Sequence, residues 1–398
     1  MGKELPWHVS HWLIGNRRIS GSRMKICLVS HNAAGAFSML PGGHIGGVER
    51  QTAMFAKYLA SRGHDVSVIT WSETGAERDE QVDGVCLIRL CAESDGFPIV
   101  RFIWPRWTSL LGALRRADAE VYYHNAAEAA TGQIALWARL NRRKFVYSVA
   151  SEPACHNPPP TLKHRRERAL YGKGVRKADS IIVQTNAQKR LLESEWGVAS
   201  TMIPMPADIS VREERNSKLP ATRPRALWIG RVVRVKRVEW LLEMAEMCPD
   251  IDFDIVGAFV EDDYKREVLE KACSIGNVVW HGRIPFDDVG RFYARASLLI
   301  CTSIWEGFPN TFLEAMANGV PIVTTFDPDG IISDKQLGGA AKSPDQLAEV
   351  AHGLVADTDA YTRTRRNCMR YFNETHRSDM VLPKFEEHLL HVALSGTR

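Results

Sequence analysis

In the first part of the chain, apolar residues follow first a strand-like pattern and then a helical one. Residues 24–30 form a short β-rich run, and a glycine-rich stretch at 42–47 follows it. Beyond the glycines, positions spaced by three and four residues share one helical face, which comprises Val48, Thr52, Phe55 and Leu59. Gly63 ends this helix before the next β-rich run, so the pattern predicts a βαβ unit.

The second part of the chain repeats this plan. A strand is predicted at 225–231, the next one at 252–257, and the helix between them has one apolar face made by Val238, Leu241, Leu242 and Ala245. Further strands are predicted at 144–150, 180–185, 277–282, 297–303 and 320–325. Alternation with helices implies parallel sheets that are covered on both faces, and the polar residues 204–225 are the best linker between two such sheets.

We therefore predict an α/β protein with two facing, doubly wound, Rossmann-like parallel-sheet domains. The first domain is expected at 24–207 and the second at 208–375, with a loose extension at 1–23 and a final helix at 376–398 that packs back on the first domain. Ligands of such sheets bind beyond the carboxyl ends of the strands. The loops that follow strands are therefore the places to look for chemistry.

Composition agrees with a globular protein of two domains. The chain has 398 residues, of which 45% are hydrophobic and 25% are charged. Its eight cysteines are scattered, which predicts reduced thiols in a reducing compartment and no zinc site. Residues 1–23 lack the features of a signal peptide, and the most apolar later stretch is interrupted by Arg101, Pro105 and Arg106. We expect a cytoplasmic protein without a membrane span.

Charge is distributed unevenly, although the net charge is only +4. Residues 1–200 contain 27 Lys and Arg against 18 Asp and Glu, a balance of +9, and the remaining residues carry −5. The amino-terminal half therefore either faces an anionic partner or has an unrelated solvated basic surface.

Two glutamates bracket the loop between a predicted strand and a predicted helix. Glu306 lies in the loop, at a sheet edge where carboxylates bind ligand hydroxyls more often than they stabilise the fold. Glu314 is predicted in the first turn of the helix, where Thr311 and Glu314 also fit a capping box. A helix amino terminus binds phosphate, so Asn310 and Thr311 are candidates for that role. The combination indicates a ligand with a phosphate and many hydroxyls, such as a sugar nucleotide.

Two other loops carry groups that suit a diphosphate. Gly230 and Arg231 close one predicted strand and Lys236 precedes the next helix, so the arginine fork and the lysine charge can clamp a diphosphate. The alternative is that the basic run 234–237 is merely solvated. The glycine-rich stretch 41–50 permits close approach of the backbone to a phosphate, although a flexible connection explains it equally well.

Neither a metal site nor a catalytic histidine is indicated. Asp-x-Asp pairs occur at 252–254, 327–329 and 357–359, but the first alternates within a strand, the others lie in turns, and the cation clamp makes a metal unnecessary. The histidines that lack metal-ligand spacing are interpreted as structural and comprise His31, His44, His124 and His281. Of these, His31 has the position best suited to a site, directly after the first strand.

In its motifs the chain resembles the retaining glycosyltransferases of family 4, which have the GT-B fold of two facing Rossmann-like domains. The resemblance rests on the glycine and helix segment 46–70, GRVVRVKR at 230–237, residues 277–303, and above all EGFPNTFLEAMANGVPIV at 306–323, with its two glutamates separated by seven residues. It extends over about residues 24–375. It implies an acceptor domain at 24–207 and a donor domain at 208–375.

The resemblance also implies residue roles and a reaction. Glu306 would contact hydroxyls of the transferred sugar, Glu314 would hold the ribose, and Arg231 and Lys236 would bind the diphosphate, with Glu306, Arg231 and Lys236 as the catalytic set. The implied donor-binding set comprises Gly47, Gly230, Arg283, Phe308, Asn310, Thr311 and Glu314. The implied reaction moves a hexosyl unit from a nucleotide-diphosphate sugar, with retained configuration and without a metal or other cofactor, to a glycan or lipid-linked acceptor in cell-surface polysaccharide or glycolipid synthesis.

Two positions depart from the family pattern. Ser151 and Glu152 stand where many members have a histidine and an aspartate, so the expected acceptor side consists of His31, Ser151 and Glu152. Pro309 stands where many members have glycine, and it offers no N–H to the donor. Two alternatives stay open: a sugar-nucleotide epimerase on the same fold, and a noncatalytic sugar-nucleotide-binding subunit.

Two segments of the first half indicate an anionic membrane as a partner. Residues 161–177 are rich in Lys and Arg, and residues 102–116 combine Trp104 and Trp107 with arginines, a mixture suited to lipid headgroups. The alternative is an ordinary basic helix and a buried aromatic cluster. We expect peripheral attachment to the inner face of the cell membrane, and no nucleic acid polymer as a partner.

Overall fold

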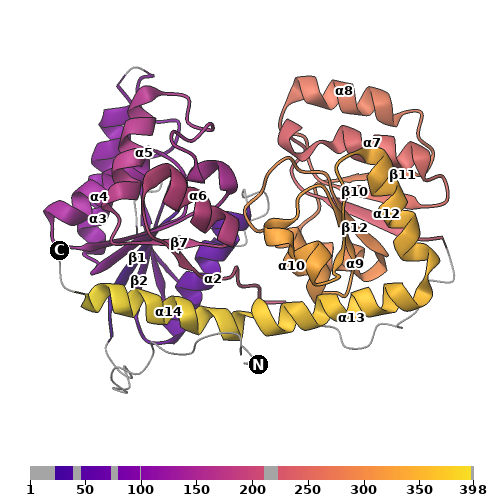
Figure 1. Cartoon of the computed structure of the whole chain (residues 1–398). Coiled ribbons are helices and arrows are strands. Elements are labelled where there is room, and N and C mark those ends of the chain that lie inside the picture. Colours follow the sequence, from indigo (N-terminus) through magenta and orange to yellow (C-terminus); the bar gives the residue numbers. More distant parts are fainter. Residues whose placement is uncertain (1–22, 39–45, 73–78, 99, 210–222, 396–398) are drawn as a thin grey trace, which may run out of the picture.

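The structure is a computed structural model, and it describes residues 23–38, 46–72, 79–98, 100–209 and 223–395. Two lobes lie side by side, and each is built on one predominantly parallel sheet (Figure 1). The predicted α/β architecture of two doubly wound domains is confirmed.

The first sheet has eight strands in the order β3-β4-β2-β1-β5-β6-β7-β8. All neighbours are parallel except β3 and β4, which form an antiparallel pair at one edge. The strands are β1 (Lys25–Val29), β2 (Asp65–Thr70), β3 (Glu80–Val82), β4 (Val85–Arg89), β5 (Val121–His124), β6 (Lys144–Ser148), β7 (Ser180–Val183) and β8 (Thr201–Met202).

Helices cover both faces of this sheet, because successive residues of its strands are apolar and enter two different cores. Cys27 and Val29 face one core, and Ile26 and Leu28 face the other. The first core is closed by α3 (Thr108–Ala117), α4 (Ala129–Leu140), α5 (Arg165–Lys177) and α6 (Asn186–Trp196). The second is closed by α1 (Ala34–Ser38), α2 (Gly47–Ser61) and the last helix, α14 (Ser378–Leu394).

The second sheet has six parallel strands in the order β11-β10-β9-β12-β13-β14. They are β9 (Arg225–Ile229), β10 (Asp252–Val256), β11 (Val278–Gly282), β12 (Leu298–Cys301), β13 (Ile322–Thr324) and β14 (Gly338–Ala340). One face packs on α7 (Val238–Met247), α8 (Asp262–Ala272) and α12 (Pro344–Ala356). The other packs on α9 (Phe286–Arg295), α10 (Asn310–Ala317), α11 (Ile331–Asp334) and α13 (Thr358–Thr375).

Each sheet reverses its strand order at one point. In the first sheet the chain builds outward on both sides of the neighbours β1 and β5, and in the second on both sides of β9 and β12. The loops at the carboxyl ends of such neighbours diverge to opposite faces and leave a crevice between them. Two crevices for ligands are therefore expected, one in each lobe.

The chain crosses between the lobes twice, and the two crossings lie side by side. The amide of Ala207 donates to the carbonyl of His376 (2.8 Å), and the amide of Ser378 donates to the carbonyl of Ala207 (3.1 Å). His376 is buried, and burial lowers its pKa to about 4, so its neutral ring donates through Nδ1 to the carbonyl of Met205 (2.8 Å). These bonds join the linker to the start of α14 at one hinge.

Helix α14 returns from the second lobe and packs under the first sheet (Figure 1). Its Phe385 stacks on Phe55 of α2, with ring centroids 3.8 Å apart. Its Glu386 accepts a hydrogen bond from Tyr58 Oη at 2.8 Å and lies 3.1 Å from His64 Nε2. The last helix of the chain is therefore part of the core of the first lobe.

Candidate active site

The loop between β12 and α10 carries Glu306 and lies at the crevice of the second lobe. Strand β12 is buried throughout, and Phe312, Leu313 and Met316 anchor α10 in the core. The loop between them is therefore held at both ends. Its fixed ends present Glu306 beyond the carboxyl end of the sheet.

Glu306 has two side-chain partners. The ammonium group of Lys236, from the short helix η3 (Arg234–Lys236), forms an ion pair with Glu306 Oε1, and Ser303 Oγ donates to the same oxygen at 2.7 Å. The sequence indicated no structural partner for Glu306, and that expectation was wrong. The pair joins the loops that follow β9 and β12, so two of the predicted catalytic residues meet at the crevice between these strands.

The basic run 234–237 divides into separate roles. Arg234 points to Glu267 and Asp263 on α8, at 2.8 Å and 3.2 Å. Arg237 instead donates to the carbonyl of Thr302 at 2.8 Å. The alternative of a solvated basic run therefore holds for Arg234 and not for Lys236.

Arg231 and Arg283 are both exposed at strand ends of the second sheet. Arg231 follows β9, and within the described part of the chain nothing binds its guanidinium group. Arg283 follows Gly282 at the end of β11, where the glycine has φ +67°. Gly230 is not crowded, since an added Cβ would meet only Trp228 at 3.7 Å, whereas one on Gly257 would lie 1.9 Å from the carbonyl oxygen of Gly230.

Glu314 binds across the interface between the lobes and does not cap its helix. Helix α10 begins at Asn310 with Pro309 as its N-cap, so Glu314 lies in the second turn and Thr311 makes no capping bond. The capping-box interpretation was therefore wrong. The buried carboxylate accepts from Tyr293 Oη (2.8 Å) and from Nη1 of Arg50 (2.9 Å), which lies on α2 of the first lobe. Burial and the Glu314 charge raise the pKa of Tyr293 well above its usual range, so its hydroxyl stays a donor.

Gly47 packs directly against the start of α10. It begins α2, and a Cβ added to it would lie 2.1 Å from Nδ2 of Asn310. A side chain at this position would therefore separate α2 from α10. His44 and the rest of residues 39–45 lie outside the described residues.

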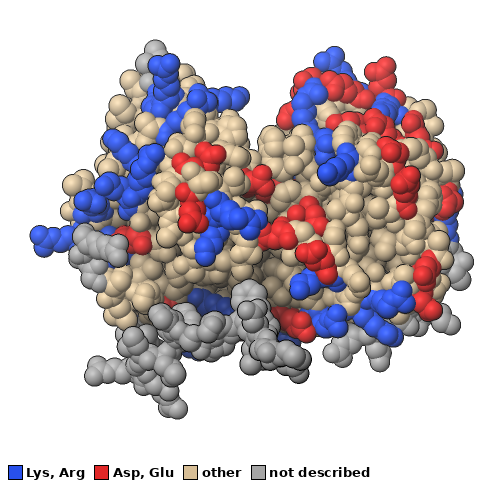
Figure 2. Space-filling model, in the orientation of Figure 1, with Lys and Arg blue, Asp and Glu red and all other residues tan. Residues whose placement is uncertain are grey.

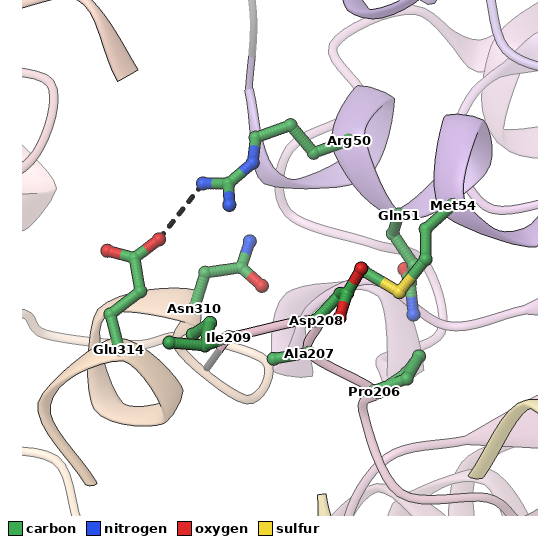
Figure 3. Close-up of a pocket in the computed structure, with 9 residues that line it drawn as sticks. All are labelled: Arg50, Gln51, Met54, Pro206, Ala207, Asp208, Ile209, Asn310 and Glu314. Atoms are coloured by element: carbon green, nitrogen blue, oxygen red, sulfur yellow. Dashed lines mark hydrogen bonds and ion pairs between the residues drawn. The ribbon is translucent and has the colours of Figure 1, made fainter. Parts of the chain in front are cut away.

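A small cavity lies next to Glu314 at the interface between the lobes. Its volume is about 40 Å³, and it is lined by α2, residues 206–209 and α10, as Figure 3 shows. Pockets that hold whole ligands measure roughly 300–1,000 Å³. This cavity is therefore too small to hold a whole nucleotide sugar.

A second set of contacts fixes the Glu306 loop against strand ends of the first sheet. The amide of Glu152 donates to the carbonyl of Glu306 (3.1 Å), and the amide of Phe308 donates to Oε1 of Gln184 (3.0 Å). A Cβ on Gly307 would lie 2.1 Å from the carbonyl oxygen of Ala150, so only glycine fits here. Ser151 and Glu152, the predicted acceptor-side residues, therefore lie next to the loop that carries Glu306.

His31 belongs to a polar cluster at the crevice of the first lobe. Its Nδ1 is 2.7 Å from Oε1 of Glu128, and its ring stacks on Trp71, with centroids 4.5 Å apart. The buried His124 also reaches Glu128, at 3.3 Å. Neither Glu128 nor Trp71 was singled out from the sequence, and His124 was interpreted as structural.

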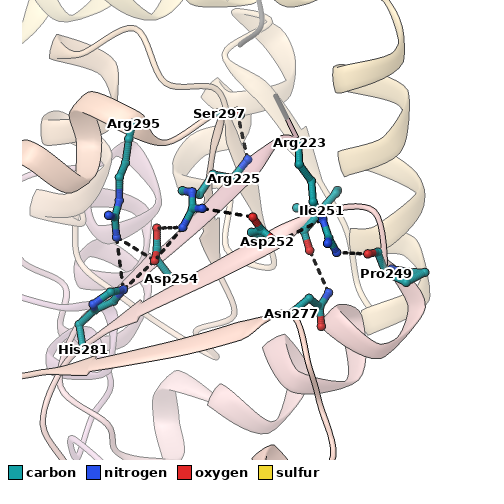
Figure 4. A network of polar contacts seen from close by, with 10 residues as sticks. All are labelled: Arg223, Arg225, Pro249, Ile251, Asp252, Asp254, Asn277, His281, Arg295 and Ser297. Atoms are coloured by element: carbon teal, nitrogen blue, oxygen red, sulfur yellow. Dashed lines mark hydrogen bonds and ion pairs between the residues drawn. The ribbon is translucent and has the colours of Figure 1, made fainter. Parts of the chain in front are cut away.

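The Asp-x-Asp pairs are engaged by protein groups. Figure 4 shows Asp254 of β10 surrounded by His281 (2.6 Å), Arg295 (2.8 Å) and Arg225 (3.3 Å). Two arginines and a histidine ring offset the cost of burying this carboxylate. Asp329 accepts the amides of Asn186 and Ala187 at the start of α6, at 2.6 and 2.8 Å. No group of three His, Cys, Asp or Glu among the described residues is arranged to hold a metal ion.

Comparison with known proteins identifies the family of this chain and confirms its fold. Residues 45–211 match the family described as Glycosyltransferase Family 4, and residues 223–357 match Glycosyl transferases group 1. The 2-deoxystreptamine N-acetyl-D-glucosaminyltransferase of Streptomyces fradiae is 26% identical over 317 residues, which cover 70% of this chain and 74% of the relative.

Two further relatives are informative. The UDP-N-acetylglucosamine–peptide N-acetylglucosaminyltransferase GtfA subunit of Streptococcus gordonii is 29% identical over 154 residues, 37% of this chain and 30% of that protein's length. The solved structure of Anabaena HepE in complex with UDP and glucose matches with a TM-score of 0.73 at 16% identity, over 93% of this chain and 100% of that chain. At this identity the structural likeness establishes the fold.

The burial of Glu314 generates a prediction about stability. Replacing Glu314 with Ala removes the acceptor of a buried tyrosine hydroxyl and should lower the free energy of unfolding by roughly 1–3 kcal/mol. Replacing Arg50 with Ala should cost less, because the Arg50 side chain is 30% exposed and Glu314 keeps its hydrogen bond from Tyr293. Thermal melting of both variants checks this order. Equal losses would show that the ion pair across the interface dominates, contrary to the expectation.

Proposed function

The chain belongs to the family 4, or group 1, glycosyltransferases of the GT-B fold, and from this premise we propose that it is a retaining hexosyltransferase. Its donor is a nucleotide sugar. The proposed acceptor is a glycan or a lipid-linked saccharide of cell-surface polysaccharide or glycolipid synthesis. The observation that supports the assignment of residues is the Lys236 to Glu306 ion pair at the crevice between β9 and β12.

We assign the donor in parts. Lys236 and the exposed Arg231 bind the diphosphate, and the free amides at the start of α10, at Asn310 and Thr311, add to the positive potential there. When the donor binds, Glu306 leaves Lys236 and accepts hydrogen bonds from hydroxyls of the transferred sugar. In the same way, Glu314 leaves Arg50 and accepts hydrogen bonds from the ribose hydroxyls. In each case the carboxylate assigned to the donor is held in place by a basic side chain until the donor binds.

Uridine is the proposed base of the donor. The GtfA relative carries UDP-N-acetylglucosamine in its name, and the structure of HepE contains UDP and glucose. By the family resemblance, backbone groups near Arg283, just beyond the end of β11, would form the pocket for the base. We propose a UDP-hexose or UDP-N-acetylhexosamine as the first donors to test.

Rate acceleration follows from where charge develops. As the glycosidic bond breaks, the diphosphate gains negative charge and the sugar ring gains positive charge. Arg231 and Lys236 stabilise the former more strongly in the transition state than in the ground state, and Glu306 lies on the side of the sugar. In the proposed mechanism the leaving phosphate accepts the proton of the attacking hydroxyl on the same face, which retains the configuration.

The turnover of two variants tests these catalytic roles. Lys236→Met should lower kcat about 100- to 1,000-fold, the usual effect of losing one transition-state donor, and Glu306→Gln should also reduce it strongly without unfolding the protein. UDP release from UDP-glucose and UDP-N-acetylglucosamine is the measurement, with the sugar product analysed for an epimer.

A matched pair serves as the control. Glu243 and Lys271 form a similar ion pair on α7 and α8, at 2.6 Å and away from the loops of the site, so Glu243→Gln and Lys271→Met should keep wild-type turnover. Normal turnover of a soluble Glu306→Gln protein would refute the role of Glu306. An epimer formed from donor alone would favour the epimerase alternative.

Metal independence is the second prediction for this reaction. Two protein cations meet the diphosphate in the proposed site, so the enzyme should keep full activity after treatment with EDTA. Loss of turnover in EDTA that is restored by magnesium or manganese would contradict the cation clamp.

We further propose that the first lobe docks on anionic membranes. Four large apolar side chains are exposed in and just before η1 (Phe102–Trp107). Phe97 and Val100, which precede it, are 75% and 48% exposed, and Ile103 and Trp104, within it, are 62% and 60% exposed. Trp107 is half-buried, so the aromatic-cluster alternative applies to it and not to Trp104. No helix within the described ranges is long and apolar enough to cross a membrane.

Basic residues lie next to these apolar side chains. The guanidinium group of Arg166, near the start of α5, stands 4.4 Å from the centroid of the Phe102 ring, and Arg165 and Lys163 are exposed beside it. Figure 2 shows many Lys and Arg side chains over this lobe. Arg168, in contrast, donates to the carbonyl of Leu162 at 2.6 Å and is only half-exposed. Each basic residue near an anionic surface contributes about 1 kcal/mol.

Membrane docking predicts two separable losses of binding. Cosedimentation with phosphatidylcholine and phosphatidylglycerol vesicles should fall with added salt, as screening requires, and with Arg165→Glu combined with Arg166→Glu. Ile103→Ser combined with Trp104→Ser should weaken binding at every salt concentration.

The control reverses Lys265 and Arg266, two exposed residues of α8 on the other lobe, and should bind like the wild type. Absence of cosedimentation at low salt would overturn the docking proposal without affecting the assignment of the donor site.

A further inference from the structure

The crevice of the first lobe contains an unusual carboxylate. Glu128 lies four residues after the end of β5 and is the N-cap residue of α4, yet its side chain makes no capping bond. It turns instead toward His31, which follows β1. The cluster therefore joins the loops of β1 and β5, the neighbours at which the strand order reverses.

One oxygen of this carboxylate is held and the other is available. Oε1 lies 2.7 Å from Nδ1 of His31 and 3.3 Å from Nε2 of His124. Nδ1 of His124 in turn lies 2.8 Å from the carbonyl oxygen of Val29, which fixes the ring. Within the described ranges no protein group binds Oε2, and the Glu128 side chain is 37% exposed. A carboxylate this strongly oriented and still open to solvent suits a hydroxyl ligand.

The cluster keeps Glu128 ionised. Burial raises its pKa, but the charge of His31 and the closeness of the His124 ring outweigh burial, so the pKa lies well below the usual range. For His31, burial lowers the pKa, and the neighbouring Glu128 charge raises it by more. The ionised carboxylate only accepts hydrogen bonds, and with so low a pKa it does not take a proton from a ligand.

The position suits the second substrate. Strand β5 neighbours β6, and residues 150–152 beyond β6 contact the loop that carries Glu306. Glu128 therefore lies beyond the strand next to the one whose following residues contact the Glu306 loop. Lys236 and Glu306 join β9 to β12 in the second lobe in the same way as His31 and Glu128 join β1 to β5 in the first.

We propose that Glu128, oriented by His31 and His124, binds a hydroxyl group of the sugar residue that accepts the transferred hexosyl unit. The half-exposed Trp71, stacked on His31, supplies an apolar surface beside it. The inference rests on the proposed transferase function. It assigns a binding residue to the side of the site where the sequence lacks the family histidine, and it makes His31 a positioning residue.

The experiment separates acceptor binding from donor chemistry. UDP release from UDP-glucose and UDP-N-acetylglucosamine is measured with and without a panel of p-nitrophenyl hexosides, on the full-length wild type, Glu128→Gln and His31→Gln. Glu128→Gln should raise the KM for the hexoside about 10- to 100-fold, as the loss of a charge-assisted hydrogen bond does. His31→Gln, whose amide can still orient Glu128, should raise it less. Release of UDP without a hexoside, and the affinity for UDP, should stay at the wild-type values.

Glu195 provides a matched control. It faces His156 at 3.8 Å with 38% side-chain exposure, close to the value for Glu128, but it lies at the far end of α6 from the strand ends. Glu195→Gln should therefore keep the wild-type KM.

Three results would overturn the inference. The first is an unchanged KM in Glu128→Gln, including the case in which the melting temperature alone falls, which would mark a structural ion pair. The second is a wild-type enzyme that hydrolyses the donor but uses none of the hexosides, which would exclude a simple sugar acceptor while the donor assignment stands. The third is a wild type that neither binds UDP nor releases it, which would refute the transferase function itself.

Discussion

The reversal of strand order in each parallel sheet is the constraint on which the site depends. Parallel strands end at a common edge, and their loops diverge only where the order reverses. In this chain those points lie between β1 and β5 and between β9 and β12. Gly307 lets the two edges meet, because its lack of a side chain brings the Glu306 loop against the carbonyl of Ala150. A single site can therefore draw residues from loops more than a hundred positions apart.

Two kinds of contact hold the lobes together, and they have different consequences for a ligand. Backbone amides at Glu152 and Phe308 fix the Glu306 loop to the first sheet, and the hinge pairs Ala207 with His376. These bonds are made by backbone groups and by the Gln184 side chain. The Arg50 to Glu314 pair instead uses the carboxylate that we propose for the ribose, so a donor bound in this way would compete with this contact across the interface.

The sequence was sufficient for the fold class and for singling out two loops that the structure brings together, because both depend on local patterns. Strand and helix spacing is visible within a few residues, and Lys236 and Glu306 lie in motifs next to predicted strand ends. Other contacts were not predictable, since Arg50, Gln184 and Glu128 are brought to their partners only through folding. The capping box failed for a related reason: α10 begins at Asn310, so Thr311 is already helical. Strand β5 was not predicted because its apolar run is only three residues long, Val121 to Tyr123, before the polar His124.

The return of α14 has a consequence for biosynthesis. Tyr123 on one face of the first sheet and Phe55 of α2 are both covered by Phe385 of α14. A ribosome releases the residues of the first sheet long before those of α14, so this apolar face stays open to water while the second lobe is made. Throughout synthesis it resembles the patches by which chains aggregate or recruit chaperones. The first lobe is complete only when the last helix emerges, which makes the two lobes one unit in folding although they are two in architecture.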